Sequence, residues 1–196
     1  MLPPPGILGG VPRPRILGGS ARGRPLATPR SGTRPTPSRV REALFDMLAF
    51  RERGTFLDLY AGSGALGLEA ASRGWRAICV ERSREAAAVV RRNARALGLD
   101  VEVHLGDAIA SARALRGRVD VCSASPPYPH DLPAIFQAIL DSGCVRPGGL
   151  YVLQHPSGMA PALRLDGAPV AAEVRRYGSN ALTVVRVPPA ERPQGG

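Results

Sequence analysis

The stretch TFLDLYAGSGALGLE, residues 55–69, decides the fold of this chain. Its first six residues, 55–60, predict a buried strand, and residues 64–73 predict a helix that follows directly. Gly62 to Gly67, which run from the turn into the helix, formally match the pattern GxGxxG. Glycine allows a tight turn and lets a ligand approach the backbone closely. The stretch therefore predicts an α/β protein with a ligand-binding loop after its first strand.

Strand-like and helix-like segments continue to alternate through the rest of the chain. Further strands are expected at 76–81, 101–106, 119–124 and 149–155, and further helices at 84–97, 108–115 and 132–142. Such alternation is typical of a mostly parallel sheet with helices on both faces. Residues 172–178 and 181–187 predict a terminal antiparallel pair. The sequence therefore predicts a seven-stranded sheet.

The segment before this alternation has a different composition. Residues 13–27 contain two short apolar runs around glycines, which predict a small β-hairpin arm. A helix is expected from Ser38, the predicted N-cap, with one apolar face formed by Val40, Leu44, Met47 and Leu48. We expect four parts: a disordered tail at 1–12, a basic segment at 13–53, a ligand-binding domain at 54–187 and a flexible tail at 188–196.

Positive charge is concentrated in the first quarter of the chain. The formal net charge is +10, and all 26 basic residues are arginine. Residues 1–53 hold ten arginines and three acids, whereas residues 54–196 hold sixteen arginines and thirteen acids. A basic arm on a nearly neutral body is typical of proteins that bind a polyanion, and the arginine fork suits phosphate. We therefore expect the arm to contact nucleic acid.

Other patterns bear on metals and on location. The cysteines Cys79, Cys122 and Cys144 are too widely spaced for a zinc motif, so we expect buried thiols, a reducing compartment and no metal. No apolar run reaches the length of a membrane span. The first twelve residues lack the basic and apolar regions of a signal peptide. These patterns favour a cytoplasmic protein that does not contact a membrane.

Acidic residues near the glycines indicate which ligand the loop holds. Asp58 ends the first strand, where a carboxylate would repel a pyrophosphate and attract the cationic amino-acid end of S-adenosylmethionine. Glu81 ends the second strand and can hold ribose hydroxyls, as it would in a nicotinamide-binding fold. Asp107 follows the third strand, near the expected adenine, and can also cap the next helix. We expect S-adenosylmethionine, with a nicotinamide cofactor as the alternative.

The segment Ser125-Pro126-Pro127-Tyr128 follows the fourth strand, at the edge where doubly wound sheets bind ligands. Two prolines fix the backbone, and their carbonyl oxygens remain acceptors without a neighbouring donor. These acceptors can bind the N–H groups of an exocyclic base amine, while Tyr128 offers a flat face for base stacking. The segment predicts transfer of an activated methyl group to a base amine.

With these motifs, the sequence resembles the bacterial small-subunit ribosomal RNA (guanine-N2)-methyltransferases of the RsmD type. Five segments carry the similarity, which runs from about residue 13 to 187: RILGGSARGRPL (15–26), RPTPSRVREALFDML (34–48), DLYAGSGALGLEAASRG (58–74), SPPY (125–128) and RRYGSNAL (175–182). The second segment is the one that generic methyltransferases lack. The resemblance implies a Rossmann-like class I methyltransferase fold over 54–187. It also implies a monomeric enzyme that methylates a guanine N2 in 16S ribosomal RNA or the assembling small subunit.

The resemblance assigns roles to individual residues. Its cofactor contacts would come from the first loop and the ends of the next two strands: Asp58, Ala61, Gly62, Ser63, Gly64, Glu81, Arg82, Asp107 and Ala108. The catalytic site would consist of Ser125, Pro126, Pro127 and Tyr128. RNA would be bound by Arg13, Arg15, Arg22, Arg24, Arg34 and Arg39.

Two places depart from the family pattern. Ser125 stands where an aspartate usually precedes the prolines, and Gln154 and His155 stand where an acid usually follows the fifth strand. Serine accepts hydrogen bonds but does not readily take a proton, and it occurs at this place in cytosine-N4 methyltransferases. The alternatives are therefore a DNA or RNA amino-methyltransferase acting on adenine N6 or cytosine N4, and a catalytically weakened RNA-binding homologue. His155 and His130 are interpreted as ordinary surface or loop residues.

Overall fold

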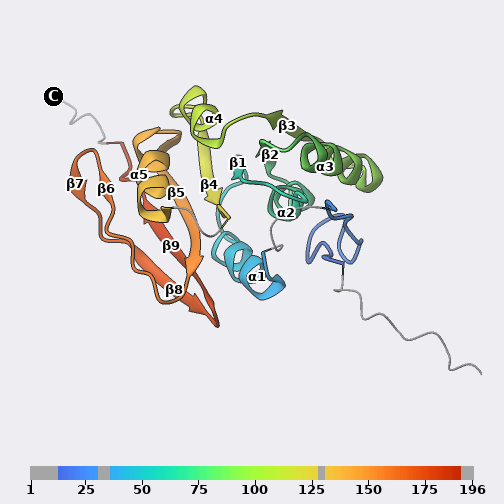
Figure 1. Cartoon of the computed structure of the whole chain (residues 1–196), viewed down its shortest axis with the longest axis horizontal. Helices are drawn as coiled ribbons and strands as arrows, with labels where there is room; N and C mark the ends of the chain where they lie inside the picture. Colours follow the sequence, from blue (N-terminus) through green and yellow to red (C-terminus); the bar gives the residue numbers. More distant parts are fainter. Residues whose placement is uncertain (1–12, 31–35, 128–130, 191–196) are drawn as a thin grey trace, which may run out of the picture.

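The computed structural model describes residues 13–30, 36–127 and 131–190. Its central sheet has seven strands in the order β3-β2-β1-β4-β5-β9-β8 (Figure 1). The strands are β1 Thr55–Leu59, β2 Arg76–Glu81, β3 Val101–Leu105, β4 Val119–Ala124, β5 Val145–Pro156, β8 Glu173–Tyr177 and β9 Asn180–Arg186. The first five are mutually parallel, and β9 pairs antiparallel with both β5 and β8. The predicted sheet with its terminal antiparallel pair is confirmed.

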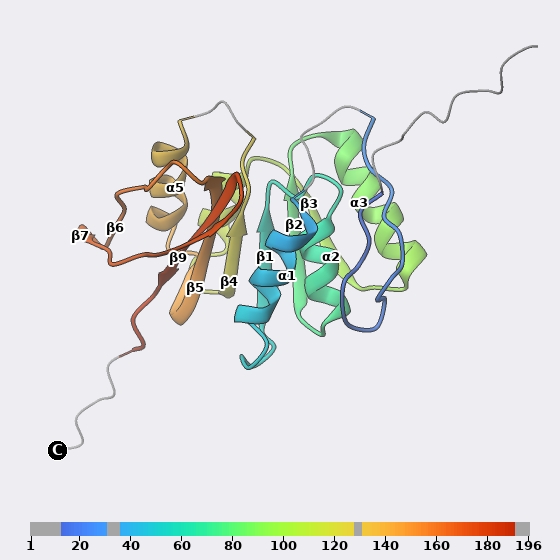
Figure 2. The same ribbon diagram turned by 90° about the horizontal axis from the view of Figure 1, so that it is seen from below.

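Helices cover both faces of the sheet (Figure 2). They are α1 Ser38–Met47, α2 Ala65–Ser72, α3 Arg84–Leu97, α4 Ala108–Ala114 and α5 Leu132–Asp141. Apolar side chains of α1 and α2 pack on one face, with α3 alongside α2, while α4 and α5 pack on the other face. The result is a three-layer sandwich in which the strand ends, with their loops, emerge at two edges.

Helix boundaries follow local capping chemistry. Ser83 accepts a hydrogen bond from the N–H of Ala86 at the start of α3, and Gly98 ends that helix with a left-handed φ of 66°. The predicted N-cap of α1 is wrong, because Pro37 occupies that position and Ser38 is the first helical residue. Proline is a poor cap because it offers no side-chain acceptor, so α1 depends on tertiary contacts.

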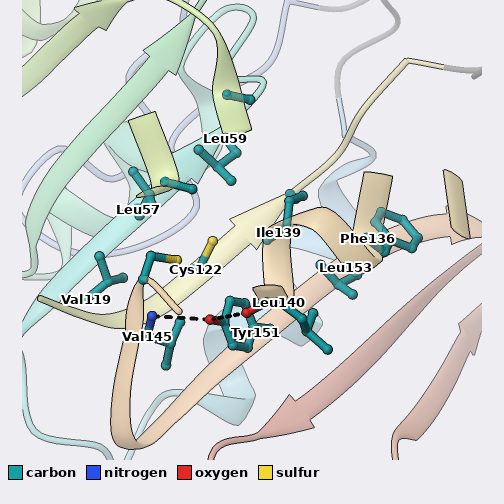
Figure 3. Close-up of a cluster of buried hydrophobic side chains, with 14 of the residues drawn as sticks. Leu57, Leu59, Val119, Cys122, Phe136, Ile139, Leu140, Val145, Tyr151 and Leu153 are labelled. Carbon is teal, nitrogen blue, oxygen red and sulfur yellow. Dashed lines mark hydrogen bonds between the residues drawn. The ribbon is translucent and has the colours of Figure 1, made fainter. Parts of the chain in front are cut away.

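The core on the α4 and α5 face is apolar with one buried phenol (Figure 3). The Tyr151 hydroxyl accepts from the N–H of Val145 at 3.3 Å and donates to the Leu140 carbonyl at 3.5 Å. Cys79, Cys122 and Cys144 are buried free thiols, which confirms that part of the expectation. Among the described residues, no group of three metal-ligating side chains occurs, and no helix is long and apolar enough to cross a membrane.

The N-terminal arm, residues 13–27, is a minimal hairpin with a single antiparallel bridge between Arg15 and Pro25. It does not project from the body, because Ile16 and Leu26 are 1% exposed and pack against α2 and α3. A second small feature, the hairpin of β6 Arg164–Leu165 and β7 Ala168–Pro169, was not predicted. Two-residue strands leave no periodic pattern in a sequence.

Candidate functional site

Three parallel strands bring the predicted site residues to one edge of the sheet. Leu59 of β1 lies beside Val80 of β2 on one side and Ala124 of β4 on the other. The segments that follow these three residues therefore emerge next to one another, at the carboxyl edge where such sheets bind ligands. They are the turn between β1 and α2, residues 60–64, here called the glycine loop, the end of β2 at Glu81, and Ser125 with the two prolines.

Asp58 is a buried carboxylate with one unsatisfied oxygen. Its Oδ2 accepts the N–H of Gly67 at 2.9 Å, whereas Oδ1 is buried without a hydrogen-bond partner among the described residues. The pKa of this carboxyl is raised to about 7, mainly by burial; the hydrogen bond from Gly67 opposes the rise, and the nearby negative charge of Glu81 adds to it. An unsatisfied buried acceptor is costly, so the site favours a ligand that brings a donor or a positive charge.

The glycine loop requires its glycines for two different reasons. Gly62 and Gly64 have left-handed φ values of 57° and 81°, which L side chains rarely adopt. A Cβ on Gly62 would meet no atom of the described chain within 4 Å, so its backbone borders open space that a ligand can enter. A Cβ on Gly67 would lie 2.2 Å from the Cys79 sulfur, so this glycine allows α2 to pack against β2. Ala61 and Ser63 are buried beside them.

Glu81 closes the loop from the side of β2. Its Oε2 accepts the N–H of Gly62 at 2.9 Å, and Oε1 accepts the N–H of Ser83 at 2.8 Å. A carboxylate has about four acceptor positions, so each oxygen can still accept a hydroxyl. Arg82 follows as an exposed side chain. The end of β2 is thus fixed in place with acceptor capacity to spare.

Asp107 caps the next helix, as its alternative role predicted. Its Oδ1 accepts the N–H of Ala110 at 2.9 Å, and Ala108 behind it is buried. Tyr60 lies close by: burial and then the charge of Asp107 raise its pKa, and its φ of 66° is left-handed. Sequence reasoning missed Tyr60. Its position before a run of glycines gave no sign that its own backbone would be strained.

The diproline segment, Ser125 to Pro127, directly follows β4, as expected. Ser125 and Pro127 are half-buried and Pro126 is buried, directly after β4 and one strand from the glycine loop. Tyr128 and His130 lie outside the described residues. Two of the expected acceptors, the carbonyls of the prolines, are therefore held on a segment anchored by its buried first proline.

A polar network that sequence reasoning did not anticipate lies at the end of β5. Thr36 Oγ1 donates to Gln154 Oε1 at 3.0 Å, and Gln154 Nε2 donates to Asn180 Oδ1 at 3.1 Å. Because Leu153 pairs with Ala124, Gln154 lies next to Ser125 in the sheet register. The network joins the segment before α1, the fifth strand and the start of β9 beside the diproline segment.

His155 is not a surface residue, so that interpretation is wrong. It is fully buried, its Nδ1–H donates to the Pro156 carbonyl at 2.9 Å, and its Nε2 accepts from the Thr183 hydroxyl at 2.6 Å. Burial lowers its pKa, opposed by the Pro156 bond. A neutral, doubly hydrogen-bonded imidazole packed edge-on to Phe136 has a structural role.

Hydrogen bonds hold the arm on two helices: α2, which directly follows the glycine loop, and α3. The N–H of Leu17 donates to Glu69 at 2.7 Å, and the Ser72 hydroxyl donates to the Gly18 carbonyl at 2.6 Å. At the other end of the arm, Asn93 exchanges two hydrogen bonds with Ala27 and donates a third to the Ser63 carbonyl, each at 3.0 Å. Asn93 therefore connects the arm directly to the predicted cofactor loop.

The arginines predicted to bind RNA differ in their surroundings. Arg13, Arg15, Arg22, Arg24 and Arg39 are exposed, and Arg34 lies outside the described residues. Two of them also fix local structure, since Arg15 donates to the Gly23 carbonyl and Arg24 to the Ala96 carbonyl, each at 2.8 Å. The exposed guanidinium groups are thus available to solvent on the arm and at the start of α1.

Comparison with known proteins gives a consistent group of relatives. Residues 14–186 match the family described as conserved hypothetical protein 95. The putative rRNA methyltransferase YlbH of Bacillus subtilis is 35% identical over 143 residues, which cover 68% of this chain and 78% of that protein. Ribosomal RNA small subunit methyltransferase D of Escherichia coli K12 is 59% identical over 54 residues, 26% of this chain and 27% of that protein.

A solved structure shares nearly the whole fold. A hypothetical protein from Thermus thermophilus is 48% identical and superposes with a TM-score of 0.78. The match covers 88% of this chain and 99% of that chain. Most of this fold therefore occurs in a second protein.

Proposed function

Because this chain belongs to the conserved hypothetical protein 95 family, we propose that it is an S-adenosylmethionine-dependent methyltransferase acting on small-subunit ribosomal RNA. We further propose that the methylated atom is the exocyclic N2 of a guanine. The family relatives named as rRNA methyltransferases support the reaction class. The observation that carries the finer proposal is the position of Ser125 to Pro127 one strand from the glycine loop.

The loop region fits the proposed cofactor better than a dinucleotide. Glu81 lies close enough to Asp58 for its negative charge to raise the pKa of Asp58, so two carboxyl groups share the loop region. Their negative charge favours a ligand with an ammonium and a sulfonium and disfavours a pyrophosphate. When bound, S-adenosylmethionine supplies an electrophilic methyl group. In this proposal Asp58 Oδ1 receives the ammonium, Glu81 receives ribose hydroxyls and Asp107 lies beside the adenine, with Ala61, Ser63, Gly64, Arg82 and Ala108 lining the rest.

The diproline segment would orient the amine. The carbonyls of this segment accept one N–H of N2, and the hydroxyl of Ser125 accepts the other, so that the nitrogen lone pair points toward the methyl donor. Most of the acceleration would come from this alignment, because the donor is already activated. Ser125 takes no proton permanently, and the proton of the methylated amine leaves to water. The proposal assigns base stacking to Tyr128.

The proposal also assigns the RNA-binding segment, the oligomeric state and the cellular compartment. Residues 54–187 would form the catalytic domain, and the basic segment 13–53 would bind RNA through its arginines. A monomer would act on the assembling small subunit in the cytoplasm, where that particle is the natural polyanionic partner. The docked arm supports this division, because it holds its arginines in fixed positions beside the cofactor loop.

The test is methyl transfer from labelled S-adenosylmethionine to small subunits that lack the modification, followed by mass mapping of the labelled nucleotide. We expect N2-methylguanosine in small-subunit RNA. Label on adenine N6 or cytosine N4, or preference for duplex DNA, would instead assign the amino-methyltransferase alternative that Ser125 leaves open. Absence of transfer with retained RNA binding would identify a catalytically weakened homologue.

A further inference from the structure

The exposed face of α3 is strongly basic. Helix α3 carries Arg84, Arg91, Arg92 and Arg95 against one acid, Glu85, and all four arginines are exposed. The spacing of seven and four residues places Arg84, Arg91 and Arg95 on one stripe of the helix. None of these residues belongs to the segments that carry the family resemblance or to the predicted RNA-binding set.

The arm lies against this helix and adds to the same surface. The arm and the three residues that follow it, 13–30, contain five arginines and no acid. Three contacts hold this segment on α3. Asn93 bonds with Ala27, Arg24 donates to the Ala96 carbonyl, and the N–H of Arg30 donates to Glu85 at 2.9 Å. Figure 2 shows the arm running alongside α3. Two basic elements far apart in the sequence therefore form one rigid surface.

A groove lies at the boundary between the two elements. It measures about 570 Å³ and is lined by Thr28, Arg30, Glu85, Ala88, Val89 and Arg92. Arg30 and Thr28 line it from the segment that follows the arm, and Arg92 lines it from α3. Glu85 is held by the N–H of Arg30, which offsets part of its charge. A concave surface lined by two arginines suits an anionic chain more than a flat surface does.

We propose that the solvent face of α3, together with this groove, binds the phosphate backbone of the RNA substrate. The inference rests on the proposed function, which supplies RNA as the polyanion. Helix α3 packs on β2 and β3, and β2 lies two strands from β4. At about 4.8 Å between neighbouring strands, that is about 10 Å across the sheet. The solvent face of α3 lies one helix diameter further out, about 10–12 Å, so an RNA segment of a few nucleotides can span from the diproline site to α3.

The test compares two triple variants of the full chain. Arg84→Gln, Arg92→Gln and Arg95→Gln remove charge from the proposed surface. Arg113→Gln, Arg116→Gln and Arg118→Gln remove the same charge from exposed residues in and just after α4, in the opposite layer. Binding of small-subunit RNA is measured between about 50 and 200 mM salt, roughly the range over which phosphate contacts dominate affinity. Binding of S-adenosylhomocysteine reports on the intact cofactor site.

We expect the α3 variant to bind RNA more weakly and to lose about 2 to 3 from the slope of log affinity against log salt, roughly one per phosphate contact. S-adenosylhomocysteine affinity should stay unchanged in both variants. The single variants Arg92→Gln and Arg95→Gln should each lose about one, which keeps the test decisive if the triple variant is unstable. An unchanged slope in the α3 variants, or an equal loss in the α4 control, would overturn the inference.

The two levels of proposal can fail separately. If the unmodified protein neither binds nor methylates small-subunit RNA, the proposed function fails. If it does both and the α3 variants do the same, then RNA lies elsewhere and only this inference fails. Retained RNA binding together with lost binding of an acidic ribosomal protein would assign the surface to a protein partner.

Discussion

At the scale of single residues, Asp58 combines structural and electrostatic roles. Burial raises its folded-state pKa to about 7, above the ordinary value of 3.8. In the ligand-free protein this group therefore favours folding below pH about 4, and that contribution is lost as pH rises through about 7. Cofactor binding has the opposite dependence, since only the ionised carboxylate attracts an ammonium.

We expect S-adenosylhomocysteine affinity to rise with pH up to about 7 and then level off. Below that value, affinity should fall by up to about tenfold per pH unit, because protonation removes the attraction. Asp58→Asn should bind more weakly at pH 8 and show little pH dependence. Calorimetry between about pH 5.5 and 8.5 measures both. The same profile in both proteins would show that another group controls binding.

Gln154 offers a second test at this scale. Gln154→Leu removes two hydrogen bonds and leaves Thr36 and Asn180 without their shared partner. We expect the KM for RNA to rise several-fold while S-adenosylhomocysteine affinity is retained, because the network borders the diproline segment and not the glycine loop. Steady-state kinetics with small subunits provide the measurement.

The matched control is Gln137→Leu on α5. Gln137 is another bridging amide, which donates to Asp141 and exchanges hydrogen bonds with Arg164. Its loss should cost a similar amount of stability, about 1–3 kcal/mol at most, without changing the KM for RNA. If both variants change the KM alike, the effect of Gln154 reflects general loosening of the fold.

At the scale of elements, a buried ion pair joins the first two helices. Arg41 of α1 and Glu69 of α2 have fully buried side chains, with Nη1 and Oε2 3.7 Å apart, and Glu69 also accepts from Arg73 at 2.8 Å. Burial lowers the pKa of Arg41, and Glu69 opposes this effect. Because Arg41 also donates to the Arg15 carbonyl, the pair connects α1 to the arm.

Glu69→Ala should destabilise the protein by about 3–5 kcal/mol, because Arg41 would be left as a buried charge without its counterion. Glu102→Ala breaks the exposed pair with Arg76, whose atoms are 2.6 Å apart, and should cost less than about 1 kcal/mol. Urea unfolding of both variants gives the comparison. Equal costs would mean that the buried pair contributes no more than a surface pair.

The elements also show how far sequence reasoning extends. Strong local signals gave β2, α3 and β4 with their observed boundaries, because short apolar runs, the Ser83 cap and the Gly98 terminator act locally. Contacts between distant segments could not be predicted. Glu69, Asn93 and Gln154 each have one hydrogen-bond partner that lies 52 to 118 residues away in the sequence.

At the scale of the whole molecule, the arm is part of the fold as well as a basic surface. Ile16 and Leu26 are buried against α2 and α3, and Asn93 connects the end of the arm to Ser63 in the glycine loop. Charge patterning indicated arginines on this segment, and those described are exposed, whereas RNA binding by them stays a prediction. It did not predict docking, which depends on two apolar residues in a segment dominated by arginine, glycine and proline.

The two roles of the arm can be separated by two variants. Deleting residues 13–27 should lower stability by about 3–6 kcal/mol, since two large aliphatic side chains lose their burial. It should also weaken S-adenosylhomocysteine binding, because Asn93 loses its partner at Ala27 and no longer positions Ser63. The second variant, Arg13→Gln, Arg15→Gln, Arg22→Gln and Arg24→Gln together, keeps the buried Ile16 and Leu26 and loses only the exposed hydrogen bonds of Arg15 and Arg24.

This charge variant should therefore lose RNA affinity and salt dependence while stability changes little, and cofactor binding should persist. Urea unfolding, calorimetry and RNA binding across salt concentrations measure the three quantities. If the charge variant is as unstable as the deletion, the arginines support the fold and their exposed groups are not primarily an RNA surface. If the deletion leaves cofactor binding intact, the glycine loop holds its shape without the arm, and the link through Asn93 has no functional consequence.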